Sequence, residues 1–105
     1  MGVLSSYAVN GFASMGEIVR SEKICLKNPY GLHMRPAAVL AAAVAPFEST
    51  VTLDAFGHSI DAKSQIAIMA ACLGCGDVIE IRAEGSDEEE ALACALDTIR
   101  YRLES

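Results

Sequence analysis

The chain has 105 residues, of which 52% are hydrophobic and 21% are charged. This length allows one domain with one hydrophobic core, and the composition excludes the weakly hydrophobic, highly charged class of disordered chains. Eight basic and fourteen acidic residues give a net charge of −6, which argues against nucleic acid and anionic membrane as partners.

Residues 1–16 contain three glycines and no sustained hydrophobic period, which is typical of a flexible leader. We therefore expect one domain over residues 17–105, and Met15 is a candidate for the natural start. No segment has the pattern of a secretory signal, and no apolar run approaches the roughly 20 residues that cross a bilayer. The sequence predicts a cytoplasmic protein without membrane insertion, in which cysteines stay reduced.

The first half of the chain alternates between strand and helix patterns. Residues 22–27 predict a strand, which the turn-forming run Asn-Pro-Tyr-Gly ends. Residues 34–45 predict a helix, because apolar residues recur at i, i+3, i+4 and i+7 until Pro46 stops the pattern. Residues 50–55 and 59–62 alternate on either side of a Phe-Gly-His turn and predict a hairpin.

The second half repeats these patterns. Residues 64–73 predict a short helix followed by glycine, and residues 79–83 predict a fourth strand. An acidic run then starts a last helix that extends to about Leu103, through a capping box that begins at Ser86 or at Asp87. The apolar stripe of the short helix consists of Ile66, Met69, Ala70 and Leu73.

The predicted order is β-α-β-β-α-β-α, with no internal repeat. Because three helices need to cover only one face of a sheet, the economical fold is an α+β open-faced sandwich. We expect a four-stranded, mainly antiparallel sheet with three helices on one face, in a protein that acts as a monomer.

The cysteines are Cys25, Cys72, Cys75 and Cys94. Cys72 and Cys75 form a Cys-x-x-Cys pair, which without a second ligand pair is at most half of a zinc site. We therefore predict no metal site, expect all four thiols to be free, and expect those of Cys72 and Cys75 to be buried as small apolar groups. His58 falls in the hairpin turn and should be exposed to solvent.

Most chemical information lies in residues 31–38, Gly-Leu-His-Met-Arg-Pro-Ala-Ala. His33 falls where a loop meets a helix, and the first N–H groups of a helix bind anions. A neutral imidazole is a nucleophile toward phosphorus, so His33 is a candidate phosphoryl acceptor. The N–H groups of Met34 and Arg35 and the Arg35 guanidinium can hold the phosphoryl group. Pro36 suits the first helical turn and makes it rigid.

The string Gly-Leu-His-x-Arg-Pro-Ala-Ala resembles the active-site signature of the HPr family of phosphocarrier proteins, and the resemblance extends over residues 22–103. It implies that His33 accepts a phosphoryl group from Enzyme I, charged by phosphoenolpyruvate, and passes it to Enzyme II components of a sugar phosphotransferase system. It also implies that no bound cofactor is needed. Three residues differ from the usual family pattern, namely Tyr30, Met34 and Gln65.

Ser64 has two interpretations. Its hydroxyl can cap the short helix that follows. In Gram-positive members that this chain resembles, the serine after Ala-Lys is phosphorylated, which implies a serine kinase/phosphorylase and a transcriptional regulator as partners. A phosphate would add negative charge near the partner surface, but the polar Gln65 departs from the pattern at this point, so both interpretations stay open.

Two further hypotheses concern partners and function. Ile66 and Met69 can form an exposed apolar surface beside His33 on which partners dock, although helical spacing more often indicates core. The alternative function is a regulatory protein that signals through His33 or Ser64 without sugar transport. A small phosphatase is disfavoured, because one histidine and one arginine supply no acid for a leaving group.

Overall fold

The computed structural model describes residues 19–103, so the predicted leader at residues 1–16 and the candidate start at Met15 lie outside the described residues. The elements are β1 (Val19–Cys25), α2 (Met34–Val44), β2 (Thr50–Ala55), β3 (His58–Asp61), α3 (Gln65–Ala70), β4 (Val78–Glu84), α4 (Glu88–Asp97) and the π-helical segment η1 (Thr98–Arg102). Among these residues, no helix is long and apolar enough to cross a membrane.

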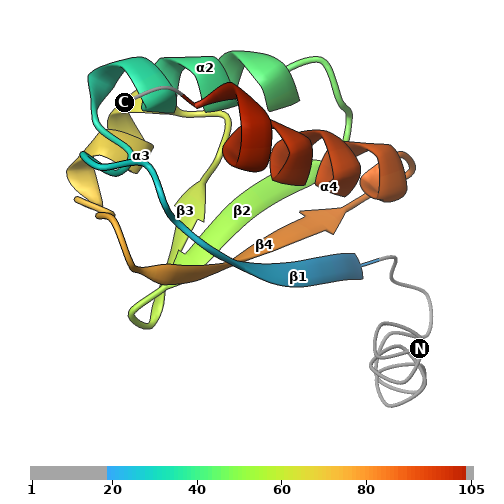
Figure 1. Cartoon of the computed structure of the whole chain (residues 1–105). Helices are drawn as coiled ribbons and strands as arrows, with labels where there is room; N and C mark the ends of the chain where they lie inside the picture. Colours follow the sequence, from blue (N-terminus) through green and yellow to red (C-terminus); the bar gives the residue numbers. More distant parts are fainter. Residues whose placement is uncertain (1–18, 104–105) are drawn as a thin grey trace.

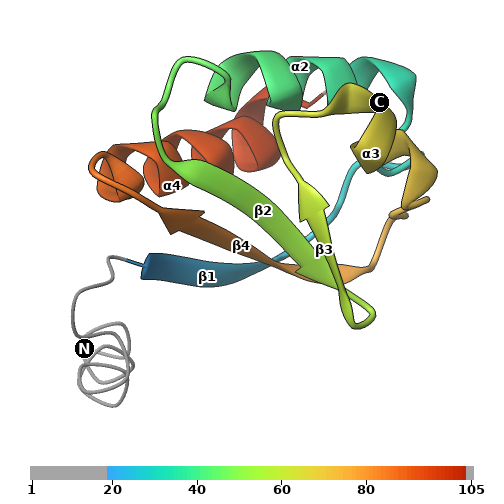
Figure 2. The ribbon, with the colours of Figure 1, turned by 180° about the vertical axis from the view of Figure 1, so that it is seen from behind.

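The four strands form one antiparallel sheet in the order β1-β4-β2-β3. Figure 1 shows α2 and α4 lying over one face of this sheet, with α3 at the end of the helical layer beside β3. Figure 2 shows the same two layers from behind, and no helix or strand of residues 19–103 covers the other face of the sheet. The predicted open-faced α+β sandwich and the predicted order of elements are confirmed.

The core lies between the sheet and the helices. Alternate residues of β2 and β4 are buried, namely Val51, Leu53 and Ala55 in β2 and Ile79, Ile81 and Ala83 in β4. The buried side of α2 consists of Pro36, Ala37, Leu40, Ala41 and Val44. β2, β4 and α2 therefore bury the apolar faces that their periods predict, and α2 is held by its whole apolar stripe.

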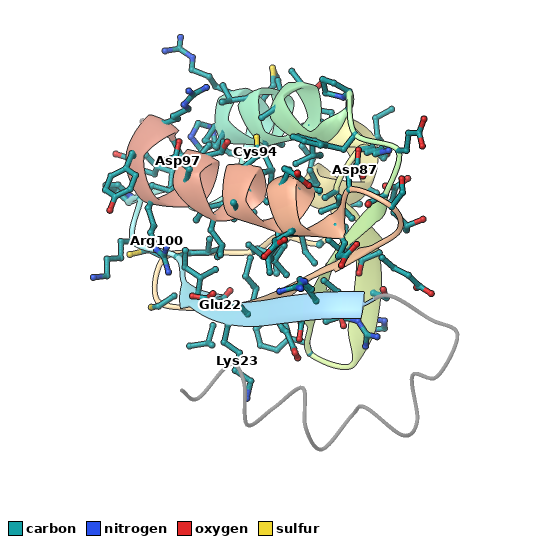
Figure 3. The ribbon with its side chains drawn as sticks, turned by 90° about the vertical axis from the view of Figure 1, so that its right-hand side faces the viewer. Glu22, Lys23, Asp87, Cys94, Asp97 and Arg100 are labelled. Atoms are coloured by element: carbon teal, nitrogen blue, oxygen red, sulfur yellow. The ribbon has the colours of Figure 1, made fainter. Side chains whose placement is uncertain are left out.

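Ion pairs join the edge strand β1 to the end of the helical layer. Arg20 Nε lies 3.2 Å from Glu88 Oε2, and Arg100 Nη2 lies 3.0 Å from Glu22 Oε2. Figure 3 looks at this side and shows the Glu22 and Arg100 side chains close together. The Arg20–Glu88 pair joins β1 to the start of α4, and the Arg100–Glu22 pair joins β1 to η1. The Arg100–Glu22 pair is solvent-exposed and should stabilise the fold only weakly.

The predicted capping box at the start of α4 is wrong. Asp87 is the N-cap residue, but its side chain makes no capping hydrogen bond. Its carboxylate instead accepts hydrogen bonds from the backbone N–H groups of Glu48 and Ser49, both at 2.9 Å, and from the Ser49 hydroxyl. The Ser86 hydroxyl donates to Glu48. Asp87 therefore joins α4 to the loop before β2 rather than closing its own helix.

These hydrogen bonds, with the Ser49 hydroxyl contributing most, lower the pKa of Asp87. A carboxyl whose pKa is lower in the folded state stabilises the fold above its unfolded pKa, and this contribution is lost as the pH falls through the folded pKa. We expect Asp87→Asn to lower the urea midpoint at pH 7, and the difference from the parent protein to shrink below about pH 4. Glu90→Gln on the same helix is the control, and a difference that stays constant with pH would contradict the assignment.

The predicted burial of Cys72 and Cys75 is wrong. Cys25, Cys72 and Cys75 are exposed, and Cys94 is partly buried, while all four thiols are free as expected. Cys25 follows a core-facing position in β1, so strand alternation turns it away from the core. Within residues 19–103, no group of three His, Cys, Asp or Glu side chains is placed to hold a metal ion.

Candidate functional site

The loop before α2 is fixed by the loop that follows α3. Gly31 has φ +66°, and a Cβ added there would lie 2.1 Å from the carbonyl oxygen of Leu73 and 2.6 Å from Cα of Gly74. The N–H of Leu32 donates to the same Leu73 oxygen at 2.9 Å. Only glycine combines this backbone conformation with this close approach, so the position of the loop depends on Gly31.

A closed turn precedes this contact. The N–H of Gly31 donates to the carbonyl oxygen of Asn28 at 3.0 Å, and the Asn28 side-chain amide donates back to the Gly31 carbonyl oxygen. Leu32 and Pro36 are buried on either side of three exposed residues at 33–35. The site is therefore an exposed segment held at both ends by buried side chains.

His33 is the N-cap residue of α2, with φ −81° and ψ −162°. Its carbonyl oxygen accepts the N–H of Ala37 at 2.9 Å, but its side chain makes no capping hydrogen bond and is exposed. The ring of Tyr30 lies edge-to-face with the imidazole, with ring centroids 6.1 Å apart and an interplanar angle of 87°. The backbone of His33 thus starts the helix while its ring nitrogens stay available for reaction.

The first backbone N–H groups of α2 are not used within the helix. In the part of the chain that the structure describes, neither the N–H of Met34 nor that of Arg35 has an acceptor. The Arg35 side chain is exposed, and no acidic side chain between residues 19 and 103 forms an ion pair with it. Two such N–H groups directly after an exposed histidine, together with an exposed arginine in the same turn, make an arrangement that suits a phosphoryl group.

α3 packs beside the start of α2, as Figure 1 shows. The side-chain amide of Gln65 donates to the carbonyl oxygen of Met34 at 3.1 Å and joins the first residues of the two helices. Met34, Ile66 and Met69 are exposed by 63%, 80% and 36%, respectively, so apolar side chains from both helices lie at the surface. We call these three residues the apolar rim. Its role in docking stays a prediction.

The predicted apolar stripe of α3 is wrong. Ile66, Met69 and Ala70 are exposed, whereas Leu73 is buried beyond the end of the helix. The buried residue of α3 is Ile68, because this short helix contacts the core only along one narrow line at the edge of the layer.

Ser64 is the N-cap residue of α3, and its hydroxyl accepts the N–H of Ala67 at 3.1 Å, which confirms the predicted cap. His58 is the first residue of β3 and is exposed, as predicted. The structure thus places His33, Met34 and Arg35 at the start of α2, to which Gln65 of α3 is hydrogen-bonded, and it leaves His58 on another element. The contacts of Tyr30 and Gln65 were not predicted, although both residues were noted as departures from the family pattern.

Comparison with known proteins gives consistent matches. Residues 20–100 match the family described as "PTS HPr component phosphorylation site". The chain is 44% identical over 69 residues to the phosphocarrier protein HPr of Mycoplasma genitalium, which covers 65% of this chain and 78% of that protein. The crystal structure of HPr-C-His from Thermoanaerobacter tengcongensis has a TM-score of 0.74 at 36% identity and covers 77% of this chain and 91% of that chain.

A further match is Crh, the catabolite repression containing protein of Bacillus subtilis, whose crystal structure is described as a dimer with a swapping domain. The TM-score is 0.65 at 28% identity, and the match covers 80% of this chain and 97% of that chain.

Proposed function

Because the chain belongs to the HPr family of phosphocarrier proteins, we propose that His33 accepts a phosphoryl group from phosphoenolpyruvate-charged Enzyme I and passes it to Enzyme II components of a sugar phosphotransferase system. The observation that carries this proposal is the exposed imidazole at the start of α2. The N–H groups of Met34 and Arg35 and the Arg35 side chain have no partner among residues 19–103.

The chemistry follows from these groups. A neutral ring nitrogen of His33 attacks the phosphorus, a P–N bond forms, and the bond to the donor breaks. The N–H groups of Met34 and Arg35 and the guanidinium of Arg35 stabilise the negative charge on the phosphoryl oxygens during transfer. Because donor and acceptor are both proteins, the ring must be exposed. In the second transfer a nucleophile of the Enzyme II component attacks the phosphorus, the P–N bond breaks, and the electron pair returns to the ring nitrogen of His33.

Partners dock, in this proposal, on the apolar rim of Met34, Ile66 and Met69. An exposed apolar group close to a reacting residue is typical of a surface that binds several proteins, and methionine adapts to different partners. The site is complete within one chain, so we propose a monomer as the active unit, located in the cytoplasm.

A second candidate function is regulatory signalling through His33 or Ser64 without sugar transport. The similarity to Crh favours it, and so does the place of Ser64 in the fold. Ser64 precedes Gln65, whose side-chain amide is hydrogen-bonded to Met34, the first residue of α2. A phosphoryl group on Ser64 would therefore add negative charge near His33, and a serine kinase/phosphorylase and a transcriptional regulator would be the partners.

The test is incubation with Enzyme I, magnesium and labelled phosphoenolpyruvate, followed by Enzyme II components and a sugar. We expect one acid-labile, base-stable phosphate per chain, and its later transfer to the sugar. No label, or only acid-stable label, would overturn the proposal. Label that forms but reaches no Enzyme II component, together with labelling of Ser64 by ATP and a serine kinase, would favour the regulatory function.

A further inference from the structure

We propose that Tyr30 is a positioning residue, which holds the imidazole of His33 in the orientation used for phosphoryl transfer. This inference rests on the proposed function of His33 as the acceptor. Its observation is the edge-to-face contact between the two rings, at 6.1 Å and 87°. This distance lies within the range of about 4.5 to 7 Å in which aromatic rings attract each other in this geometry.

Tyr30 has a rigid backbone although its ring is 74% exposed. The hydrogen bonds between Asn28 and Gly31 close the turn that contains it. Gly31 in turn packs directly against the backbone of Leu73 and Gly74, and the next residue, Leu32, donates its N–H to the Leu73 carbonyl oxygen. The Tyr30 ring therefore extends from a fixed point and restrains whatever it touches.

The imidazole of His33 lacks any other restraint of this kind. Its side chain makes no capping hydrogen bond, and the contact with Tyr30 is the one aromatic pair found in residues 19–103. An exposed side chain without such a contact samples several rotamers. Because phosphoryl transfer needs the nitrogen in line with the phosphorus, a contact that favours one ring orientation raises the fraction of reactive encounters.

A positioning role predicts which kinetic constant a substitution of Tyr30 changes. An edge-to-face pair favours the paired arrangement by about 2- to 10-fold. Loss of the ring should therefore lower kcat for phosphorylation by about that factor. KM for the protein substrate should stay unchanged, because the ring acts on His33 and not on the partner.

The experiment compares Tyr30→Ser, which removes the ring, with Tyr30→Phe, which keeps it. Tyr101→Ser is the matched control, because Tyr101 is 77% exposed and lies in η1. In the free protein, side-chain NMR follows His33, and His58 is the internal reference, since the chain has two histidines. We expect Tyr30→Ser to shift the His33 ring resonances and to average its χ1 couplings. Tyr30→Phe and Tyr101→Ser should resemble the parent protein.

Kinetics with Enzyme I complete the test. A lower kcat in Tyr30→Ser that Tyr30→Phe rescues supports the positioning role. Unchanged His33 resonances in Tyr30→Ser, or an effect confined to KM, would overturn it, because Tyr30 would then be a bystander or a docking residue. If the parent protein accepts no phosphoryl group, the proposed function fails, and the NMR comparison alone decides whether Tyr30 orients the ring.

Discussion

Replacing His33 by alanine is expected to abolish phosphorylation by Enzyme I, with a loss of more than about a thousandfold in rate. The imidazole supplies the electron pair for the P–N bond, and no neighbour can replace it. The guanidinium of Arg35 has no acceptor atom to form a bond to phosphorus, and Met34 carries only a thioether. The measurement is the initial rate of labelling from phosphoenolpyruvate at fixed Enzyme I.

His58→Ala is the matched control, because it removes the other histidine from an exposed position at the start of β3. We expect this variant to be labelled at the parent rate. Since the His33 side chain is exposed and makes no capping hydrogen bond, His33→Ala should change the free energy of unfolding by less than about 0.5 kcal/mol. Full labelling of a folded His33→Ala variant would show that another residue is the acceptor.

Gly31→Ala should have the largest effect on stability and should also slow transfer. The added methyl group would lie 2.1 Å from the Leu73 carbonyl oxygen, in a backbone conformation with φ +66° that side chains disfavour. The two loops must then separate, and the hydrogen bond from Leu32 to Leu73 is lost. We expect a loss of about 3 kcal/mol or more in the free energy of unfolding, measured with urea, together with slower labelling of His33.

Gly57→Ala separates the steric clash from the backbone cost. Gly57 also has a positive φ, +80°, but a Cβ there would meet no atom within 4 Å. We expect this variant to lose only about 1 kcal/mol and to be labelled at the parent rate. Equal destabilisation by the two substitutions would mean that the contact with Leu73 does not hold the loop in place.

The parts of the fold that could be predicted are those that bury one regular face. The period of residues 34–45 gives α2 almost to the residue, because its whole apolar stripe is buried. β1 starts earlier than predicted, because its ends follow its pairing with β4 rather than its own alternation. The stripe of α3 was wrong because so short a helix at the edge of a layer keeps most of its surface exposed, whatever its residues.

The candidate site also has one part that could be predicted from the sequence and one part that could not. The position of His33 at a helix start follows from local signals, namely the glycine before it and the proline after it. The contact of Gly31 with Leu73 and the hydrogen bond from Gln65 to Met34 join segments far apart in the sequence. Such contacts depend on how α2 and α3 pack, and no local pattern encodes them.

The position of His33 limits the order in which partner proteins can bind. His33 and Met34 lie at the start of α2, beside Gln65 at the start of α3. On the proposed function, donor and acceptor both dock on this area, so the two proteins cannot occupy it at once. Donor and acceptor must alternate, and each complex has to dissociate before the next one forms. An excess of Enzyme II components would then compete with Enzyme I for the same surface of this protein. The rate of phosphoryl transfer through His33 would depend on the concentration ratio of the two partners.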